Sequence, residues 1–317
     1  MMMPPQDEQK RDWAARLGNE LEGLEILVPE SDEEALEHLP GVDVAYGWIS
    51  PEMLPHAERM TLLQSPQAAP PDWYYYPELV SSPVTVTNMR GIYNDHIAQH
   101  TMMYVLALAR GLPDYFDAQR NRRWDKQAQR HPTIDLTRAT VLIVGVGGIG
   151  QETARLCDAF GMRVLGTDAR WEWDVPMVEK HAPEELDALL PEADFVIVTV
   201  PHTPETEGMW HRDRFRRMKR TGYFINIGRG MTTRLADLVE ALQAGEIAGC
   251  GLDVFDEEPL PEDHPLWALP NVILTPHIAV HDADNVEERR FQVLRDNLRR
   301  LIRGEPLLNV VDKEMWY

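Results

Sequence analysis

The stretch from Ala139 to Arg170, ATVLIVGVGGIGQETARLCDAFGMRVLGTDAR, limits the possible folds more than any other part of the sequence. An apolar run, Val141 to Val144, leads into glycines spaced as GxGxxG, and a helical segment follows as far as Phe160. A second apolar run, 163–167, then ends at Asp168. Strand, glycine turn, helix and strand in this order form a βαβ unit, whose two strands are parallel. The segment therefore predicts an α/β fold built on a doubly wound parallel sheet.

The glycines of this turn also indicate a ligand. Gly145 permits the tight turn, Gly147 lets backbone N–H groups approach a pyrophosphate, and Gly150 allows the helix to pack closely on the strand. Asp168 is placed to accept hydrogen bonds from a ribose and to repel a 2′-phosphate, so NAD(H) is expected, while Arg170 keeps NADP as an alternative. The residues of this segment expected to contact the cofactor are Gly145, Gly147, Gly148, Ile149, Gly150 and Asp168.

Further apolar runs ending at Gly, Pro, Ser or Asn predict the remaining strands. Those at 24–29, 42–48, 61–65 and 84–88 indicate a small α/β domain, and those at 194–201, 222–228, 248–254 and 271–276 extend the large sheet. Helices are expected at 212–220 and 234–245. A helix at 94–111 is apolar around much of its circumference, so we expect it to be buried against another domain or subunit.

Composition excludes several classes of function. The 317 residues favour two domains, and a net charge of −21, from 52 acidic and 31 basic residues, argues against binding to nucleic acid or anionic membranes. No apolar stretch is long enough for a membrane span and the start is polar, so we expect a cytoplasmic protein. Cys157 and Cys250 are too few and too far apart for a disulfide framework, and we expect buried, inert thiols. The acidic surface fits either salt adaptation or an ordinary acidic protein.

Four polar residues lie at or beyond the carboxyl ends of the last three predicted strands. Ligands of parallel sheets bind beyond the carboxyl ends of strands, which places Arg229, Asp253, Glu258 and His277 at one edge.

Several motifs occur in the order and at the spacing of one family. The stretches VGVGGIG, VPHTPETEG, INIGRG, GLDVFDEEPLPEDHPLW and NVILTPHIA resemble those of the D-isomer-specific 2-hydroxyacid dehydrogenases over nearly the whole chain. The resemblance implies a substrate domain from residues 1–92 and 282–317, with an NAD-binding Rossmann domain, residues 93–281, inserted into it. It also implies a homodimer with the 94–111 helix in its interface.

The resemblance assigns roles to the residues at the sheet edge. His277 is expected to be the acid/base that exchanges a proton with the substrate oxygen, with Glu258 hydrogen-bonding its ring and favouring the charged form. Arg229 is expected to bind the carboxylate of a small 2-oxo or 2-hydroxy acid. Asp253 is expected to hold the nicotinamide amide, and His202 to line the cofactor cleft. The remaining cofactor contacts implied by the motifs involve Val200, Pro201, Thr206, Ile227, Gly228, Arg229 and His277.

One stretch departs from the family pattern. Members commonly carry a glycine-containing turn whose N–H groups hold the substrate carboxylate, whereas this chain has QSPQAAPPDWYYYPELV. Because Pro70 and Pro71 lack N–H groups, Ala68, Ala69 or Asp72 are left as candidate donors. The aromatic residues 73–76 are candidates for the wall of an unusual substrate pocket.

Other functions stay open at this point. Formate dehydrogenases share the architecture but carry glutamine at the Glu258 position, which argues against that activity. An NAD-sensing protein without catalysis, similar to the C-terminal binding corepressors, and a phosphite dehydrogenase are both compatible with the motifs. His96 and His100, four residues apart on a helix, lack a third ligand nearby in the sequence, so packing is favoured over metal binding.

Overall fold

The computed structural model describes residues 1–3, 8–68, 70–171 and 174–314. Its contacts divide the chain into two compact units. Unit 1 comprises Met1–Ile92 and Asp284–Tyr317, and unit 2 comprises Tyr93–Ala283. Among the described residues, no helix combines the length and the apolar character needed to cross a membrane.

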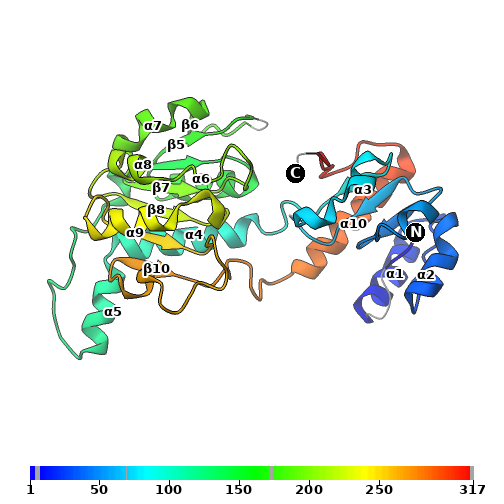
Figure 1. Cartoon of the computed structure of the whole chain (residues 1–317), viewed down its shortest axis with the longest axis horizontal. Coiled ribbons are helices and arrows are strands. Elements are labelled where there is room, and N and C mark those ends of the chain that lie inside the picture. The colour runs from blue at the N-terminus through cyan, green and yellow to red at the C-terminus, as the bar shows by residue number, and fades with distance from the viewer. Residues whose placement is uncertain (4–7, 69, 172–173, 315–317) are drawn as a thin grey trace. The chain divides into compact units, whose positions relative to one another are not determined.

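Unit 2 is built on a seven-stranded sheet in which every neighbouring pair is parallel (Figure 1). The strand order is β10-β9-β8-β7-β4-β5-β6, so the chain reverses direction across the sheet between β4 and β7. The predicted doubly wound sheet is therefore confirmed. The strands are β4 (Thr140–Val144), β5 (Arg163–Thr167), β6 (Val178–His181), β7 (Phe195–Val198), β8 (Tyr223–Asn226), β9 (Gly249–Leu252) and β10 (Val272–Leu274).

Alternate residues of these strands enter two separate cores. In β4, Val141 and Ile143 pack with residues of α4 and α6, whereas Leu142 and Val144 pack with residues of α7, α8 and α9 on the other face. Helices thus cover both faces, which explains why the strands are nearly continuous apolar runs. The helices of unit 2 are α4 (Asn94–Ala109), α5 (Leu112–Arg120), α6 (Gly148–Ala159), α7 (Leu186–Leu189), α8 (Arg212–Arg217) and α9 (Leu235–Gln243).

Helix α4 is covered in part by its own unit. Its buried face packs on α6 and on strands β8 and β9. The expected contact of this helix with another domain or subunit stays a prediction. The ring of Tyr104 lies directly on β9, where a Cβ atom on Gly251 would come within 2.7 Å of it. Met103 and Leu106 stay exposed on the opposite side of α4.

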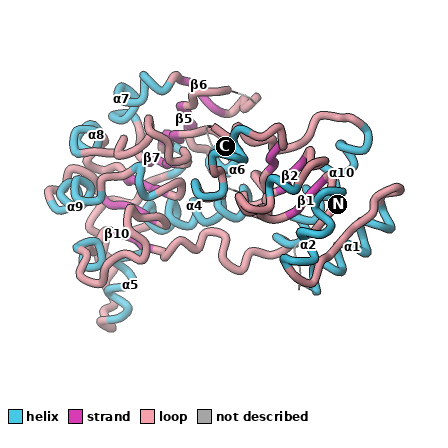
Figure 2. The backbone as a smooth tube through the Cα atoms, turned by 45° about the vertical axis from the view of Figure 1, so that its right-hand side comes forward, coloured by secondary structure: helices cyan, strands magenta, loops and turns pink. Residues whose placement is uncertain are grey.

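Unit 1 contains a three-stranded parallel sheet, β1 (Val44–Tyr46), β2 (Leu62–Gln64) and β3 (Thr85–Thr87), among the helices visible in Figure 2. Helix α1 packs on α10, with the ring centroids of Trp13 and Phe291 5.8 Å apart. The helices of this unit are α1 (Glu8–Glu20), α2 (Asp32–His38), α3 (Pro77–Ser81) and α10 (Val286–Arg303).

The predicted strand at 24–29 is wrong. Only Leu27 pairs, through one bridge to Met2, and Met2 in turn pairs with Ala45 of β1. The side chains of residues 1–3 are buried in this unit, although the start of the sequence is polar on average. Met2 therefore lies between Leu27 and strand β1 in the backbone pairing.

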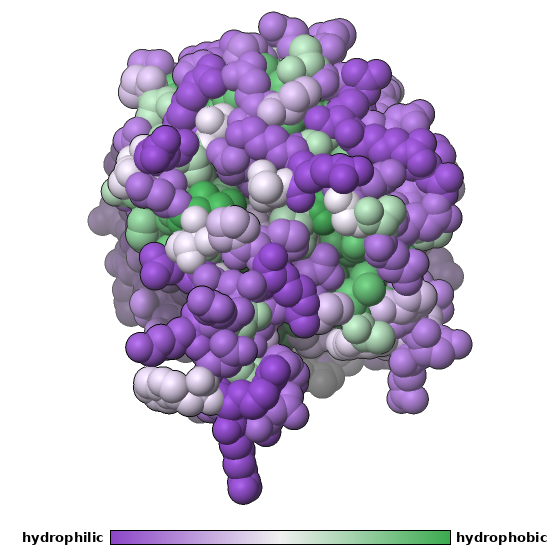
Figure 3. Space-filling model, turned by 90° about the vertical axis from the view of Figure 1, so that its left-hand side faces the viewer, coloured by the Kyte–Doolittle hydropathy of each residue, from purple (hydrophilic) through white to green (hydrophobic). Residues whose placement is uncertain are grey.

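The surface is polar over the face that Figure 3 shows. The face shown in Figure 3 is mainly hydrophilic, and hydrophobic residues are visible only in separate patches. Cys157 and Cys250 are both free and buried, as expected.

Candidate active site

The carboxyl ends of β8, β9 and β10 bring the four predicted residues of the sheet edge together. These strands are neighbours in the sheet, so the loops that follow them meet at one edge. Arg229 lies just beyond β8, Asp253 directly follows β9, and His277 lies just beyond β10. Glu258 belongs to the loop between β9 and β10.

His277 and Glu258 form a hydrogen-bonded pair. The Nδ1 atom of His277 lies 2.8 Å from Oε2 of Glu258, and the other carboxylate oxygen accepts the N–H of Phe255 at 2.9 Å. The side chains are 48% and 37% exposed, so a ligand can reach them. Within the described residues the structure shows no hydrogen bond at Nε2 of His277. That nitrogen is therefore the atom available for proton exchange.

Arg229 is an exposed residue, and its positive charge interacts with Glu258 of the hydrogen-bonded pair. Its Nη1 donates to the carbonyl of Gly228 at 2.7 Å. Burial by the surrounding protein atoms lowers the pKa of Arg229, and the charge of the Glu258 carboxylate acts in the opposite direction. Arginine stays charged at any physiological pH, so the group presents a fixed cation beside the acidic loop.

Asn226 holds the Arg229 turn, and sequence reasoning did not identify it as part of the site. Its side chain is fully buried at the end of β8. The amide nitrogen donates to the carbonyl of Arg229 at 3.1 Å, and the amide oxygen accepts the N–H of Gly228 at 3.0 Å. The same nitrogen lies 3.2 Å from the hydroxyl oxygen of Thr232 and 3.0 Å from that of Thr233. A lone asparagine in an apolar strand was the available signal, since buried polar groups need partners.

The turn after Arg229 packs directly on the loop that leads to Glu258. A Cβ atom on Gly230 would lie 1.8 Å from the carbonyl oxygen of Phe255, so only glycine fits. This backbone contact fixes the distance between the cationic turn and the acidic loop.

Asp253 is buried and faces the turn that carries His277. It is 1% exposed, and its carboxylate accepts the N–H groups of Ile278 and Ala279 at 2.9 and 3.0 Å and the hydroxyl of Thr275. These contacts hold the backbone on both sides of His277. The expected contact of Asp253 with a nicotinamide amide stays a prediction.

The glycine turn is closely packed at Gly150 and open at Gly147. Gly145 has φ +94, and its N–H donates to the carbonyl of Thr167 at 2.8 Å. A Cβ on Gly150 would lie 2.1 Å from the carbonyl oxygen of Gly145, whereas one on Gly147 would meet nothing within 4 Å. The first N–H groups of α6 have no partner inside their own helix, so the open space at Gly147 suits a pyrophosphate.

Asp168 lies beside this turn. One carboxylate oxygen accepts the N–H of Val146 at 2.6 Å, and the other accepts the N–H of Arg170 at 2.8 Å. Each oxygen keeps a further lone pair for a ribose hydroxyl. The carboxylate therefore lies where the ribose next to the pyrophosphate is expected.

The loops after β7 and β8 contain the other predicted cofactor contacts. Thr206 donates to the carbonyl of Pro201 at 2.7 Å and thereby closes the loop that also carries His202. A Cβ on Gly228 would lie 2.6 Å from the carbonyl oxygen of Val200, so these two loops touch. The side chain of Ile227 is buried, which leaves its backbone as the part that can face a ligand.

The stretch that departs from the family pattern is only partly described. Ala68 is half-buried, Ala69 lies outside the described residues, and Asp72 begins a short 3-10 helix without a described side chain. Tyr74 and Tyr75 belong to the core of unit 1, so they do not wall a pocket. Trp73 is 60% exposed, and its ring packs edge-on against Trp48.

Metal binding finds no support in the described part of the chain. There, no three histidine, cysteine or carboxylate side chains gather around one point. His100 instead hydrogen-bonds to Tyr104 and Thr275.

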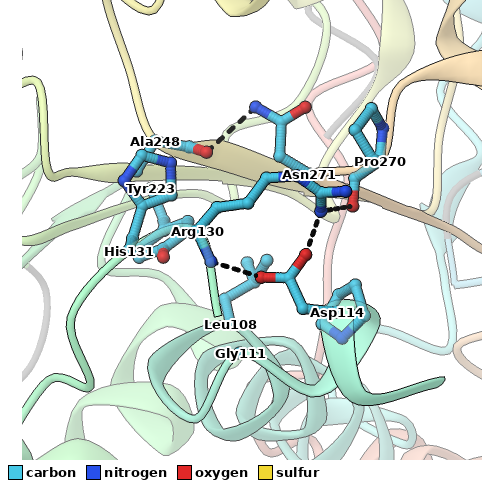
Figure 4. A pocket seen from close by; sticks show the side chains of 10 residues that line it. Leu108, Gly111, Asp114, Arg130, His131, Tyr223, Ala248, Pro270 and Asn271 are labelled. Carbon is cyan, nitrogen blue, oxygen red and sulfur yellow. Dashed lines mark hydrogen bonds and ion pairs between the residues drawn. The ribbon is translucent and has the colours of Figure 1, made fainter. Parts of the chain in front are cut away.

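A small pocket opens at the other end of the large sheet (Figure 4). Tyr223, Ala248 and Asn271 line it from the amino ends of β8, β9 and β10, opposite the edge with His277. Asp114 and Arg130 form an ion pair in it, and the guanidinium also donates to the carbonyl of Pro270 at 3.4 Å. Its position, at the end of the strands opposite His277, excludes it as the site predicted from the motifs.

Comparison with known proteins agrees with this geometry. Residues 102–279 match the family model described as D-isomer specific 2-hydroxyacid dehydrogenase, NAD binding domain. The chain is 36% identical to a glyoxylate reductase of Thermofilum pendens over 242 residues, which cover 75% of this chain and 71% of that protein. It is also 36% identical to a human glyoxylate reductase/hydroxypyruvate reductase over 225 residues, covering 68% and 66% of the two chains.

Solved structures extend the likeness to the whole chain. A D-isomer specific 2-hydroxyacid dehydrogenase from Xanthobacter autotrophicus, solved with NADPH and MES, matches with a TM-score of 0.82 and 30% identity, covering 100% and 99% of the chains. An NADPH-dependent glyoxylate/hydroxypyruvate reductase from Sinorhizobium meliloti matches with a TM-score of 0.78 and 26% identity over 100% and 99%. The chain therefore belongs to the D-isomer-specific 2-hydroxyacid dehydrogenase family, as its motifs predicted, and is an NAD-binding oxidoreductase of that family.

Proposed function

We propose that this protein reduces a small 2-oxo acid to the D-2-hydroxy acid with NADH, and catalyses the reverse oxidation. The observation that carries the proposal is the 2.8 Å contact between His277 and Glu258 at the sheet edge that also bears Arg229. A proton donor, its carboxylate partner and a fixed cation are the groups that this reaction needs besides the cofactor.

In the proposed reaction, NADH supplies the hydride to the carbonyl carbon of the substrate. His277 gives the proton on Nε2 to the carbonyl oxygen, and in the oxidation it takes that proton back. Glu258 holds the ring through Nδ1–H and balances the charge of the imidazolium, while the Arg229 guanidinium binds the substrate carboxylate. We further propose that unit 1 takes part in substrate binding through a backbone N–H group of Ala68, Ala69 or Asp72.

The proposed substrate class follows from the relatives as well as from the site. The curated proteins named above are glyoxylate and hydroxypyruvate reductases, whose substrates are small 2-oxo acids. We place the substrate of this chain in the same class and leave the identity of the acid to experiment.

NADH is the proposed cofactor because of Asp168. A carboxylate at the ribose repels the 2′-phosphate of NADPH. The relatives from Xanthobacter and Sinorhizobium were solved with NADPH and NADP, so the choice of cofactor varies within the family. Arg170 follows Asp168 closely and is the residue through which NADPH would be accepted here.

We infer that two copies associate through α4 and α5. Met103 and Leu106 of α4 and Leu112 and Phe116 of α5 are exposed apolar side chains, and exposed apolar clusters mark interfaces. Light scattering on the purified protein tests this dimer, and a monomeric mass would refute it. We also infer a cytoplasmic enzyme, because NADH is an intracellular cofactor and both thiols are free.

The central experiment follows the oxidation of NADH and of NADPH by the purified protein with glyoxylate, hydroxypyruvate, pyruvate and branched and aromatic 2-oxo acids. Turnover of any of these acids supports the proposal, and D-configured product completes it. Binding of NADH without turnover of any acid would refute it, and would favour a sensor or, if NAD⁺ is reduced with phosphite, a phosphite dehydrogenase.

A further inference from the structure

A buried polar network links α4 to the turn that carries His277. The Nε2 atom of His100 lies 3.0 Å from the hydroxyl oxygen of Thr275 and 3.2 Å from that of Tyr104. The two hydroxyl oxygens are 2.5 Å apart, and Thr275 is hydrogen-bonded to Asp253. His100 is 13% exposed and its Nε2 is 3.6 Å from a carboxylate oxygen of Asp253.

The direction of these hydrogen bonds follows from the carboxylate at their end. Ionised Asp253 only accepts, so the Thr275 hydroxyl must donate to it. The oxygen of Thr275 can then accept from the Tyr104 hydroxyl and from Nε2–H of His100. Burial lowers the pKa of His100, against the opposing charge of Asp253, which agrees with a neutral ring that carries its proton on Nε2. Every donor in the network therefore points toward Asp253.

Asp253 connects the hydrogen-bond network to the turn that carries His277. Its carboxylate accepts the backbone N–H groups of Ile278 and Ala279 in addition to the Thr275 hydroxyl. The turn between these contacts places His277 at φ +53, a left-handed backbone conformation that residues other than glycine rarely adopt. Contacts on both sides of His277 therefore stabilise a backbone conformation that is unfavourable without them.

The opposite end of the network is anchored on the sheet. The Tyr104 ring is fully buried against Gly251 of β9, where no Cβ atom would fit. Thus α4 is packed on β9, and from this helix His100 reaches the turn.

We propose that His100 is a positioning residue for His277, acting through Thr275 and Asp253 to fix the turn in which the acid/base lies. The inference rests on the proposed function for its catalytic meaning. It gives α4 a role in the reaction although the helix supplies none of the groups expected to touch the substrate.

The test compares His100→Leu, which removes the donor at similar volume, with His100→Gln, whose amide can donate in place of Nε2–H. We expect H100L to lower kcat by roughly 10- to 100-fold, since small displacements of catalytic groups have effects of this size. NADH affinity should change much less than kcat, because the glycine turn expected to hold the pyrophosphate is untouched. H100Q should restore most of the lost kcat. His56→Leu, the same change at an exposed histidine of unit 1, serves as the matched control and should behave as the wild type.

Hydrogen exchange provides a readout that needs no turnover. Mass spectrometry of the peptide spanning 275–281 should show faster exchange at Ile278 and Ala279 in H100L, and near wild-type exchange in H100Q. If H100L does not fold, Tyr104→Phe replaces it, since that change removes a single hydroxyl from the same network and should speed exchange at the same two amides.

Two results would overturn the proposal. One is unchanged exchange and unchanged kcat in H100L or Tyr104→Phe, and the other is equal damage in H100L and H100Q, which would assign the effect to packing. Failure of the proposed function looks different. In that case the wild type reduces no 2-oxo acid, while exchange at Ile278 and Ala279 still responds to the His100 variants.

Discussion

The Nδ1 atom of His277 meets Oε2 of Glu258 at 2.8 Å, although 19 residues and the strand β10 separate the two in the chain. The loop after β9 leads Glu258 back to the edge of the sheet where β10 ends, so both side chains reach the same point. Carboxylate and imidazole in this arrangement leave Nε2 of the histidine for a substrate.

Replacing His277 by alanine should lower turnover by at least roughly 10²-fold, the usual contribution of a general acid. Glu258→Gln should have a smaller effect, because the amide oxygen still accepts Nδ1–H while the balancing charge is lost. Steady-state kinetics with NADH and the best 2-oxo acid measure both effects, and fluorescence titration with NADH should show unchanged binding. Near-normal turnover in His277→Ala would remove the residue from the mechanism.

Arg229→Lys should reduce kcat/KM for the 2-oxo acid by roughly 10- to 100-fold, because a charged hydrogen bond contributes about 1.5–3 kcal/mol and lysine cannot bind a carboxylate through two N–H groups. Most of the loss should appear in KM for the acid. An unaltered kcat/KM would show that another cation binds the carboxylate.

Asp168→Ala should shift the cofactor preference toward NADPH. The change removes the repulsion of a 2′-phosphate and the acceptor for the ribose hydroxyls. The ratio of kcat/KM with NADH to that with NADPH measures the shift, and Asp168→Ala combined with Arg170→Ala shows whether the arginine holds the phosphate. If the ratio does not move in Asp168→Ala, a different residue recognises the ribose.

Two glycines of the turn should respond in different ways to the same substitution. A Cβ on Gly150 would lie 2.1 Å from the carbonyl oxygen of Gly145, so Gly150→Ala should lower the Tm as well as NADH affinity. A Cβ on Gly147 meets nothing within 4 Å, so Gly147→Ala should fold normally. Its affinity for NADH should nevertheless be lower than that of the wild type, because the methyl group enters the space assigned to the pyrophosphate. Equal NADH affinity in Gly147→Ala and wild type would place the pyrophosphate elsewhere.

The sequence predicts best those features whose signals are local. The glycine turn with its flanking strands is readable because the spacing of Gly145, Gly147 and Gly150 is itself the structural requirement. Edge strand β6 was missed because two of its four residues, Glu179 and Lys180, are exposed and polar. No apolar run marks such a strand, although backbone pairing with β5 makes it one.

The support of the site was harder to predict than its expected catalytic residues. Asn226 hydrogen-bonds to the Arg229 turn from the end of strand β8. The sequence shows that this strand residue is polar, but it does not show which groups the side chain will contact. The hydrogen-bonding partner of His100, Thr275, is 175 residues away, so the sequence could favour packing over metal binding for His100 but could not identify this partner. Contacts of this kind depend on how α4 packs on β9, and local sequence does not contain that information.

The His100 network should make the stability of the protein sensitive to acid. Burial lowers the pKa of His100 in the folded protein from its ordinary value of 6.5, while the charge of Asp253 opposes this and the Tyr104 hydroxyl faces the same nitrogen. His100 then binds a proton more readily in the unfolded chain than in the folded one. The free energy of unfolding therefore rises with pH as the pH passes from the lowered pKa up to 6.5. The neutral ring contributes fully above pH 6.5, and its contribution is lost as the pH falls below that value.

H100Q cannot be protonated, so the loss of Tm between about pH 7.5 and about pH 5.5 should be smaller in H100Q than in the wild type. Thermal unfolding of both proteins across this range measures the difference, with His56→Leu as the control for a histidine that is exposed. Identical pH dependence in wild type and H100Q would show that protonation of His100 is not coupled to unfolding.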